Sequence, residues 1–450
     1  MLIRFAVSNL FSFKDEAEFN MLPGKKISRL AHHKYGNGQV DVLKLAAIYG
    51  ANGAGKSNFI RAVEALQAFV VNGDIAPVLI NEKFKLSKST SSLPIYMGIE
   101  FMKDKEAFLY EIEISGLEVT MESLYISGQG KKEDTLLFSR TQEMGKIKIR
   151  FHSSFYEQKD GELFSNMLET TFIKSNKSAL NLLSSLNHNG LERITQAFSW
   201  IKNNLIIITP KSRLVSLPHI FDLDKSVNKF ANDLICSFST GVASVHVEIK
   251  PLLEFIGADN KKMLENITAQ ILSAPNKVRV LSNDVIAVNL EGCVVTKQLF
   301  LQHRNDIGQL VNFSLSEESD GTKRLLEYIP AIQQIIENEV TYLIDEMERS
   351  VHALIIKEII AKFSADQGTK GQLIFTTHES NLLDQDIFRQ DEIWFVQKNS
   401  VGASEMYPLS DFKEHHTIDI QKGYLNGRYG AIPFLGNLHD LNWNKYATEE

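Results

Sequence analysis

Hydrophobic and polar positions near the start of the chain predict strands, then a helix, then a sheet. Residues 2–13 (LIRFAVSNLFSF) and 43–50 (LKLAAIYG) have the apolar character of β-strands. Residues 58–71 predict a helix, because one apolar stripe recurs at helical spacing: Phe59, Ile60, Val63, Leu66 and Phe69. Residues 95–152 alternate between β-like segments and charged or glycine turns, so we expect an antiparallel sheet there.

The pattern changes in the middle of the chain. From about 160 to 275 the apolar positions have helical spacing, and β-like positions return at 277–303. Helical and strand-like segments then alternate through 322–337, 340–346, 351–363, 372–378 and 391–398. This alternation predicts a parallel sheet with helices packed on its faces.

These patterns predict three segments. We expect residues 1–155 and 276–450 to form the two parts of one α/β head, with a smaller antiparallel β subdomain in the first part. Residues 156–275 should be a mostly helical insertion, and we place an oligomer or partner interface there.

Composition limits the class of protein. A hydrophobic share of 44%, a charged share of 23% and a net charge of −7 are those of an ordinary globular protein. The apolar runs are too short to cross a bilayer and the N-terminus reads as a strand, so we expect a cytoplasmic location. Cys236 and Cys293 are far apart in sequence, which argues against a disulfide framework or a metal cluster. Because each lies in an apolar stretch, we expect both to be buried structural thiols.

The segment GANGAGKS at residues 50–57 matches the pattern GxxxxGK[ST], between a predicted strand and a predicted helix. Such a loop binds phosphates with its backbone N–H groups and the helix N-terminus. Lys56 would reach the β- and γ-phosphates, and Ser57 would bind Mg²⁺. The predicted ATP-binding residues are Gly50, Ala51, Asn52, Gly53, Ala54, Gly55, Lys56, Ser57 and Asn58.

Two further strands end in residues that suit phosphate chemistry. VTYLIDE ends in Asp345, which could hold Mg²⁺, and Glu346, which could take a proton from the attacking water. QLIFTTH ends in His378, which could donate a hydrogen bond to the γ-phosphate. Because HESNL at 378–382 lacks the second histidine of HExxH, a zinc protease is excluded.

A polar loop before the helix at 322–337 predicts a second anion site. It combines a hydroxyl and a glycine at a helix N-terminus, within Ser319, Asp320, Gly321 and Thr322. A helix cap explains part of this pattern. A second anion site fits if it closes on the ATP held by another copy of the chain.

The order of these motifs resembles that of ATP-binding-cassette ATPase heads, on the branch of the SMC, Rad50 and OLD-like proteins. More closely, IRFAVSNLFSFKDE, SDGTKRLL, FTTHESNLLD, RQDEIWFV and GYLNGRYGAIPFL resemble the ATP-binding subunits of bacterial abortive-infection type L (RloA-like, AAA_15-class) systems. The resemblance covers about residues 1–125 and 300–435.

The resemblance implies an ABC-type P-loop ATPase head and assigns a role to each motif residue. Lys56 and Ser57 would bind phosphate and Mg²⁺, Asp345 would be the Mg²⁺-associated acid, Glu346 the catalytic base and His378 the switch. Ser319, Asp320, Gly321 and Thr322 would form the signature that acts in trans on a partner's nucleotide. Asp320 stands where transporters have glycine, and MERSVH follows in place of the usual Asp-bearing loop. For the remaining Mg²⁺ residue we name Glu100 as a candidate.

The resemblance also implies a function, which is that of an ATP-driven switch in anti-phage defence. ATP sandwiched between two or more copies would control a separate effector, a nuclease or toxin, in response to a phage-derived trigger. The chain has no coiled-coil heptads and no clustered acids for its own nuclease site.

Two rival functions remain open from the sequence. A DNA-repair ATPase acting on DNA ends would use the basic loop with Lys25, Lys26 and Arg29, although the net charge does not indicate nucleic acid. A low-turnover scaffold would use ATP to oligomerise and sequester a toxin.

Overall fold

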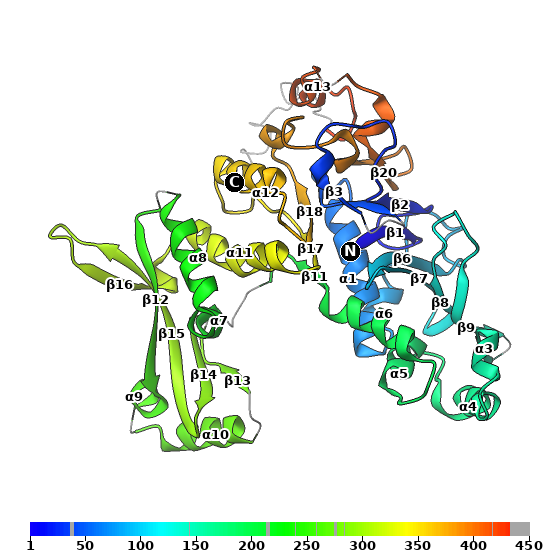
Figure 1. The fold of residues 1–450 in the computed structure, drawn as a ribbon, viewed down its shortest axis with the longest axis horizontal. Helices are drawn as coiled ribbons and strands as arrows, with labels where there is room; N and C mark the ends of the chain where they lie inside the picture. Colours follow the sequence, from blue (N-terminus) through cyan, green and yellow to red (C-terminus); the bar gives the residue numbers. More distant parts are fainter. Residues whose placement is uncertain are drawn as a thin grey trace, which may run out of the picture. The chain divides into compact units, whose positions relative to one another are not determined.

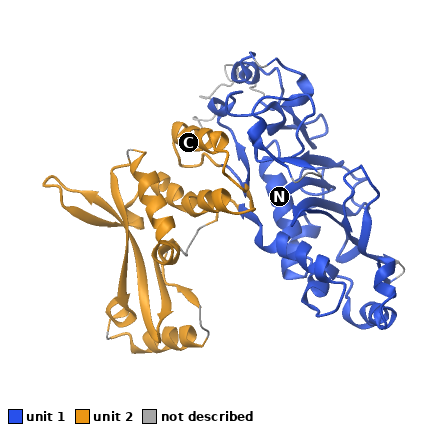
Figure 2. Ribbon diagram, viewed as in Figure 1, with its two compact units in different colours: residues 1–207, 343–346, 372–450 blue, residues 208–342, 347–371 orange. Residues whose placement is uncertain are grey.

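The structure is a computed structural model and describes residues 1–432 except 37–39, 144, 213–216, 239, 258, 274–276, 283 and 416. Figure 1 shows the elements in chain order, and Figure 2 shows the chain divided into two compact units. Unit 1 comprises residues 1–207, 343–346 and 372–450, and unit 2 comprises residues 208–342 and 347–371.

Unit 1 is a mixed α/β unit. Its helices are α1 Lys56–Asn72, α2 Pro77–Ile80, α3 Ser153–Tyr156, α4 Gly161–Met167, α5 Ala179–Ser185, α6 Glu192–Asn203 and α13 Ile420–Leu425. Its strands are β1 Leu2–Ser8, β2 Ala17–Asn20, β3 Lys34–Gly36, β4 Asp41–Leu43, β5 Leu45–Gly50, β6 Ile95–Lys103, β7 Glu106–Ser115, β8 Glu118–Ile126, β9 Thr135–Glu143, β10 Lys146–Phe151, β18 Gln372–Thr377, β19 Ile393–Lys398 and β20 Ser404–Pro408. Strands β11 Leu205–Ile208 and β17 Thr341–Ile344 each cross a unit boundary.

The sheet that carries the glycine loop has the order β11-β17-β18-β5-β19-β20. Strand β5 pairs in parallel with β18 on one side and with β19 on the other. This confirms the parallel sheet expected from the alternation of strands and helices. The predicted apolar stripe of α1 is buried, so the loop between β5 and α1 is fixed at both ends by packed elements.

A second, seven-stranded sheet has the order β10-β9-β8-β7-β6-β1-β2. Every neighbouring pair in it is antiparallel, as expected for residues 95–152. One hydrophobic core contains side chains of both sheets together with α1, α5 and α6. The β subdomain and the parallel sheet therefore form one packed unit.

The first strand is shorter than the sequence pattern predicts. Residues 2–13 were expected to form one strand, but β1 ends at Ser8, and Asn9 and Phe11 adopt positive φ angles of 54° and 52°. The Asn9 amide donates to the carbonyls of Thr90 (2.8 Å) and Leu93 (2.9 Å), which stabilises the reversal. The reversal presents Phe11 and Ser12 next to the glycine loop instead of extending the sheet.

Residues 156–207 belong to unit 1, although the expected helical insertion begins at residue 156. The buried carboxylate of Glu122 on β8 accepts hydrogen bonds from the backbone N–H groups of Ala179 (2.7 Å) and Leu180 (2.9 Å) at the start of α5. It also accepts from the Tyr110 hydroxyl (2.9 Å) and lies 3.4 Å from Arg140. A buried anion at a helix N-terminus thus fixes this helical region to the antiparallel sheet.

Unit 2 combines helices with a five-stranded sheet. Its helices are α7 Leu217–Leu223, α8 Lys225–Cys236, α9 Leu252–Ile256, α10 Lys261–Leu272, α11 Asp320–Glu337 and α12 Ala353–Ala365. Its strands are β12 Val242–Pro251, β13 Val278–Val280, β14 Val285–Leu290, β15 Cys293–Arg304 and β16 Leu310–Ser314. The sheet order is β12-β15-β14-β13, with β16 also paired to β15.

The expected helical region contains strands as well as helices. Residues 242–251 form β12, which pairs along its length with β15. The alternation of Val245, Val247 and Ile249 with polar residues is the period of a strand, and it explains this departure. The expected boundary at residue 275 lies outside the described residues.

The expectation for the cysteines was wrong, since both side chains are exposed. Cys236 is the last residue of α8, on a face away from the buried Val227, Ala231 and Ile235. Cys293 follows the turn at Glu291 and Gly292 between β14 and β15. An apolar neighbourhood in sequence does not bury a residue at the end of an element. No helix in the described part of the chain is long and apolar enough to span a membrane.

We predict that Glu122→Ala destabilises unit 1 by about 3–5 kcal/mol, because buried Arg140 loses its anionic partner and the N–H groups at the start of α5 lose their acceptor. Urea unfolding followed by far-UV circular dichroism measures this loss. Glu118→Ala, an exposed position on the same strand, should change stability by less than about 0.5 kcal/mol. Equal effects of the two substitutions would contradict the role of Glu122.

Candidate phosphate-binding site

The glycine loop occupies residues 51–55, between Gly50 at the end of β5 and Lys56 at the start of α1. Gly55 has a φ of 123°, and a Cβ atom there would collide with the Ser404 hydroxyl. Around Gly53, which has a φ of 76°, a Cβ would meet no atom within 4 Å. The loop is thus tightly supported on one side and open at its centre, as a phosphate cradle requires.

Two serines from distant parts of the chain support the loop. The Ser404 hydroxyl on β20 donates to the Ala54 carbonyl (2.6 Å) and lies 2.8 Å from the Ser12 hydroxyl. The Asn58 amide on α1 donates to Ser12 (2.9 Å). Ser12 and Ser404 could not be predicted from the sequence, because no local motif marks a residue that acts on a loop far away in the chain.

Lys56 and His378 point to the same place. The Lys56 ammonium donates to the Gly50 carbonyl (2.7 Å) and lies 3.0 Å from Nε2 of His378. Lys56 is buried, with 5% of its surface exposed. Because β18 pairs with β5, the end of β18 delivers His378 to the lysine. A γ-phosphate bound by this lysine would therefore be within reach of the histidine.

The acidic strand end faces the first turn of α1. The Ser57 hydroxyl donates to Oδ1 of Asp345 (3.2 Å), and the same carboxylate oxygen accepts from the Thr376 hydroxyl (2.6 Å). Thr376, which is fully buried on β18, also accepts the Glu346 backbone N–H (2.8 Å). One threonine hydroxyl thus orients both acidic residues.

The backbone at Glu346 is in the left-handed region, with a φ of 51°. This conformation costs a non-glycine residue about 1–2 kcal/mol, and the hydrogen bond to Thr376 helps to hold it. The turn at this point ends β17, so Glu346 does not continue the direction of the strand.

The donor set suits Mg²⁺ only when phosphate oxygens complete it. Ser57 and Asp345 supply oxygen ligands, which this cation prefers. Among the described residues, no group of three or more His, Cys, Asp or Glu side chains could hold a metal on its own. Magnesium would therefore bind with the nucleotide and not to a cage made by the protein.

Comparison with protein families identifies the chain. The model of an AAA domain described as a putative AbiEii toxin of a type IV toxin–antitoxin system (AAA_21) matches residues 45–384, which is more than half of the sequence. The chain belongs to this AAA domain family. The match includes the glycine loop, the acidic strand end and His378.

The sheets described above agree with the expected fold class. That class is an α/β ABC-type P-loop ATPase head with an antiparallel β subdomain. The solved structures that match the chain include SMC heads. The SMC head bound to the C-terminal winged-helix domain of ScpA has 11% identity, covers 90% of this chain and 97% of that chain, and has a TM-score of 0.42. The head from Thermotoga maritima has 14% identity, coverages of 90% and 98%, and a TM-score of 0.36.

A third SMC head, which has an extended coiled coil and is bound to the C-terminal domain of ScpA derived from Pyrococcus furiosus, has 13% identity, coverages of 95% and 99%, and a TM-score of 0.39. A comparison with curated proteins gives no match.

The predicted signature residues of the AAA domain lie in unit 2, at the start of α11. Ser319 is the N-cap, and its hydroxyl accepts the Thr322 N–H (3.1 Å). A Cβ on Gly321 would lie 2.6 Å from the Ser350 carbonyl, so close packing explains the glycine. Ser319 and Asp320 are exposed. The structure thus confirms the helix cap and leaves the trans role of these residues as a proposal.

The segment after Glu346 is held by α11. The Tyr328 hydroxyl donates to the Met347 carbonyl (2.9 Å) and accepts from Arg324 (3.0 Å). Burial raises the pKa of Tyr328 to about 12, so the hydroxyl keeps its proton and the hydrogen bond. MERSVH therefore begins with a fixed backbone, even though it lacks the usual acid.

Glu100 has a structural role. Its carboxylate is buried, pairs with Arg4 (2.8 Å) and accepts from the Ser127 hydroxyl (2.5 Å), all within the antiparallel sheet. None of the described hydrogen bonds or ion pairs of Glu100 connects it to the glycine loop, so its contacts do not support the expected role at Mg²⁺.

A cavity of about 210 Å³ lies beside the glycine loop. Phe11, Ser12, Asn58 and Arg61 line it, together with Glu82, Lys83, Phe84, Lys85, Leu86, Lys398 and Gly402. The Arg61 guanidinium lies 4.1 Å from the centre of the Phe11 ring. Sequence analysis did not find this cavity, because it depends on the chain reversal after β1.

We predict that Thr376→Val lowers the kcat of ATP hydrolysis about 10- to 100-fold, because Asp345 and Glu346 lose the hydroxyl that orients them. Thr376→Ser keeps the hydroxyl and should restore most of the rate. Steady-state phosphate release gives kcat and KM, and thermal unfolding checks that both variants fold. An unchanged kcat in Thr376→Val would show that the hydroxyl does not orient the acids.

Proposed function

We propose that this AAA domain hydrolyses ATP and acts as a nucleotide-timed switch. One observation supports this most directly: Lys56, Ser57, Asp345, Thr376 and His378 come together at the carboxyl ends of adjacent parallel strands. Ligand sites in such sheets lie at this edge.

ATP fits the polarity of the site. Its triphosphate would lie against the loop, where Lys56 leaves its carbonyl partners for the phosphate oxygens. Mg²⁺ bound with ATP would neutralise charge on the β- and γ-phosphates, held by Ser57 and Asp345. The buried hydroxyl of Thr376 keeps the Asp345 carboxylate turned toward Ser57.

Glu346 is proposed as the general base that accepts a proton from the attacking water. The hydrogen bond from its backbone N–H to Thr376 holds the turn that carries this carboxylate. His378 is placed beside Lys56 and would donate to the γ-phosphate. Release of phosphate would remove the partner of His378, and the histidine would thereby report the state of the nucleotide.

The nucleoside part of ATP is assigned to the cavity beside the loop. Its volume of about 210 Å³ and its Phe11–Arg61 stack suit a base that packs on an aromatic or guanidinium plane. Ser12 and Asn58 connect this cavity directly to the loop.

We propose that ATP joins two copies of the chain. The exposed Ser319 and Asp320 at the start of an 18-residue helix would contact the nucleotide held by the other copy. Closure is favoured only if ATP binds the closed form better than the open form, and a contact in trans provides that difference.

The biological output that we propose is control of a separate effector, a nuclease or toxin, in an anti-phage system triggered by a phage product. Two findings support it: the sequence resemblance to abortive-infection ATPases and the family description, which names a putative toxin of a toxin–antitoxin system. The finer assignment to type L systems remains part of this proposal. Residues 156–275 remain our proposed location for an oligomer or partner interface.

The DNA-repair alternative has less support from the structure. Arg29 in the basic loop pairs with Asp386 (2.7 Å), and His33 is buried beside Glu392 (2.9 Å). His33 is therefore engaged inside the protein, whereas Arg29 is paired at the surface with 43% of its side chain exposed. Hydrolysis that is stimulated by DNA and loses this stimulation when Lys25 and Lys26 are neutralised would favour the alternative.

We predict that Phe11→Ala weakens ATP binding about 10-fold, because the base loses its stacking surface. Its affinity for inorganic tripolyphosphate should stay unchanged, whereas Lys56→Ala should weaken both ligands. Isothermal titration calorimetry measures each affinity, with Leu93→Ala as an exposed control outside the cavity. A parallel loss of tripolyphosphate binding in Phe11→Ala would place the base elsewhere.

For the sandwich itself, we predict that Glu346→Gln with ATP and Mg²⁺ doubles in mass, or assembles further, because binding proceeds and hydrolysis is blocked. Multi-angle light scattering compares the mass without nucleotide, with ADP and with ATP. Lys56→Ala is the control that cannot respond. A constant oligomeric mass would favour the scaffold alternative, and a constant monomer would rule out the trans role of Ser319.

A further inference from the structure

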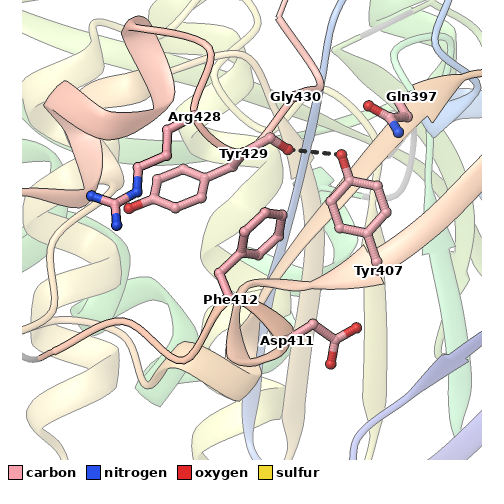
Figure 3. A pocket seen from close by; sticks show the side chains of 7 residues that line it. All are labelled: Gln397, Tyr407, Asp411, Phe412, Arg428, Tyr429 and Gly430. Atoms are coloured by element: carbon pink, nitrogen blue, oxygen red, sulfur yellow. Dashed lines mark hydrogen bonds between the residues drawn. The ribbon is translucent and has the colours of Figure 1, made fainter.

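A hollow of about 460 Å³ in unit 1, which we name the aromatic pocket, takes no part in the proposed ATP site. Its lining is Gln397, Tyr407, Asp411, Phe412, Arg428, Tyr429 and Gly430 (Figure 3). Three of these residues belong to GYLNGRYGAIPFL, a motif that the ATPase chemistry leaves without a role. The last three residues of that motif, 433–435, lie outside the described part of the chain.

The walls of the pocket are aromatic rings in fixed positions. Phe412 lies between Tyr407 (ring centres 5.9 Å apart) and Tyr429 (5.2 Å apart), as Figure 3 shows. The Tyr407 hydroxyl donates to the Tyr429 carbonyl (2.8 Å). Burial raises the pKa of Tyr407 to about 12, so that hydroxyl stays neutral and keeps this bond. The rings are thus held before any ligand arrives.

Gly430 allows this wall to close. It has a φ of 66°, and a Cβ atom there would lie 2.8 Å from the Tyr407 hydroxyl and collide with the Gln397 amide. The glycine of the motif is therefore needed for the amide of β19 and the ring of β20 to approach the same point.

The charges around the pocket favour a cation. Arg428 is paired with Glu414 (2.9 Å), whose side chain is only 5% exposed. Within the residues that the structure describes, no cation lies within ion-pair distance of the exposed Asp411. In Figure 3, Asp411 lies on the opposite side of Phe412 from Arg428. The exposed end of the pocket thus combines a free carboxylate with aromatic faces, the two groups that bind a guanidinium.

The pocket shares its walls with the support of the glycine loop. Strand β20 carries both Tyr407 of the pocket and Ser404, which donates to Ala54 in the loop. On β19, Phe395 stacks on Tyr429 (5.6 Å) and contacts Tyr49 (6.3 Å), the residue before Gly50. Packed side chains therefore connect the pocket to the loop at two points.

We propose that the aromatic pocket is a docking site for an arginine side chain presented by the separate effector protein. The guanidinium would pack against Phe412 and Tyr407 and donate hydrogen bonds to the carboxylate of Asp411. This docking rests on the proposed function, which supplies the effector. The shared walls would let the effector sense the loop through β19 and β20.

The test uses the full chain and N-acetyl-arginine amide as the probe, observed by saturation-transfer-difference NMR. We expect saturable binding of this probe. N-acetyl-citrulline amide has the same shape without the charge, and its affinity should be at least 10-fold weaker. Asp411→Asn and Phe412→Ala should each weaken the probe at least 5-fold, while Lys413→Gln, an adjacent exposed position, should not. Thermal unfolding checks that the variants fold.

Other outcomes overturn the proposal. Equal binding of the citrulline probe, or preferred binding of AMP, would reject a guanidinium site in favour of a neutral or nucleotide ligand. Tighter binding of free L-arginine than of the amide probe would indicate a metabolite and not a partner protein. Lys56→Ala should bind the probe normally, so a failed ATP switch and a failed pocket would be distinguished. Loss of probe binding in that variant would reject a site that is built by the pocket residues alone.

Discussion

The parallel pairing of β5 with its two neighbours is the constraint on which the site depends. Register places Thr377 beside Tyr49 and Val396 beside Gly50, so the carboxyl ends of three strands meet at the loop. The loop can therefore receive His378 from one side and the support of β20 from the other. Parallel strands must be joined by long crossovers, so the residues of this site are necessarily far apart in sequence.

Hydroxyl groups perform much of the positioning at this edge. Thr376 orients Asp345 and the backbone of Glu346, while Ser12 and Ser404 fix the loop from behind. All three of these residues are buried, so water does not readily replace the hydrogen-bond partners of their hydroxyls. The energetic value of each hydrogen bond is modest, but a misplaced carboxylate at a phosphate costs much more in rate than in stability. These residues thus matter for the chemistry without touching it.

Two buried or paired charges show how the fold uses electrostatics away from the proposed ATP site. Glu122 joins the antiparallel sheet to α5, and Glu414 neutralises Arg428 at the aromatic pocket. The first fixes a helical region that continues directly from the β subdomain. The second leaves Asp411 as the unpaired charge of its pocket among the described residues. The roles of Glu122 and Glu414 both depend on which side chains the fold brings together and not on the net charge of the chain.

The sequence by itself determined the elements that local pattern controls. Periodicity and backbone chemistry within a few residues predicted the loop at 50–57, the helix after it and the strand ending in Asp345 and Glu346. The alternation of strands and helices predicted a parallel sheet, but the order of its strands is a tertiary feature. The reversal after Ser8, the strand β12, the exposure of both cysteines and the structural role of Glu100 were not predicted. The roles of Ser12, Ser404 and Thr376 could not be predicted from the sequence either. Their partners lie far away in the chain, and only tertiary packing decides which distant groups share one low-dielectric environment.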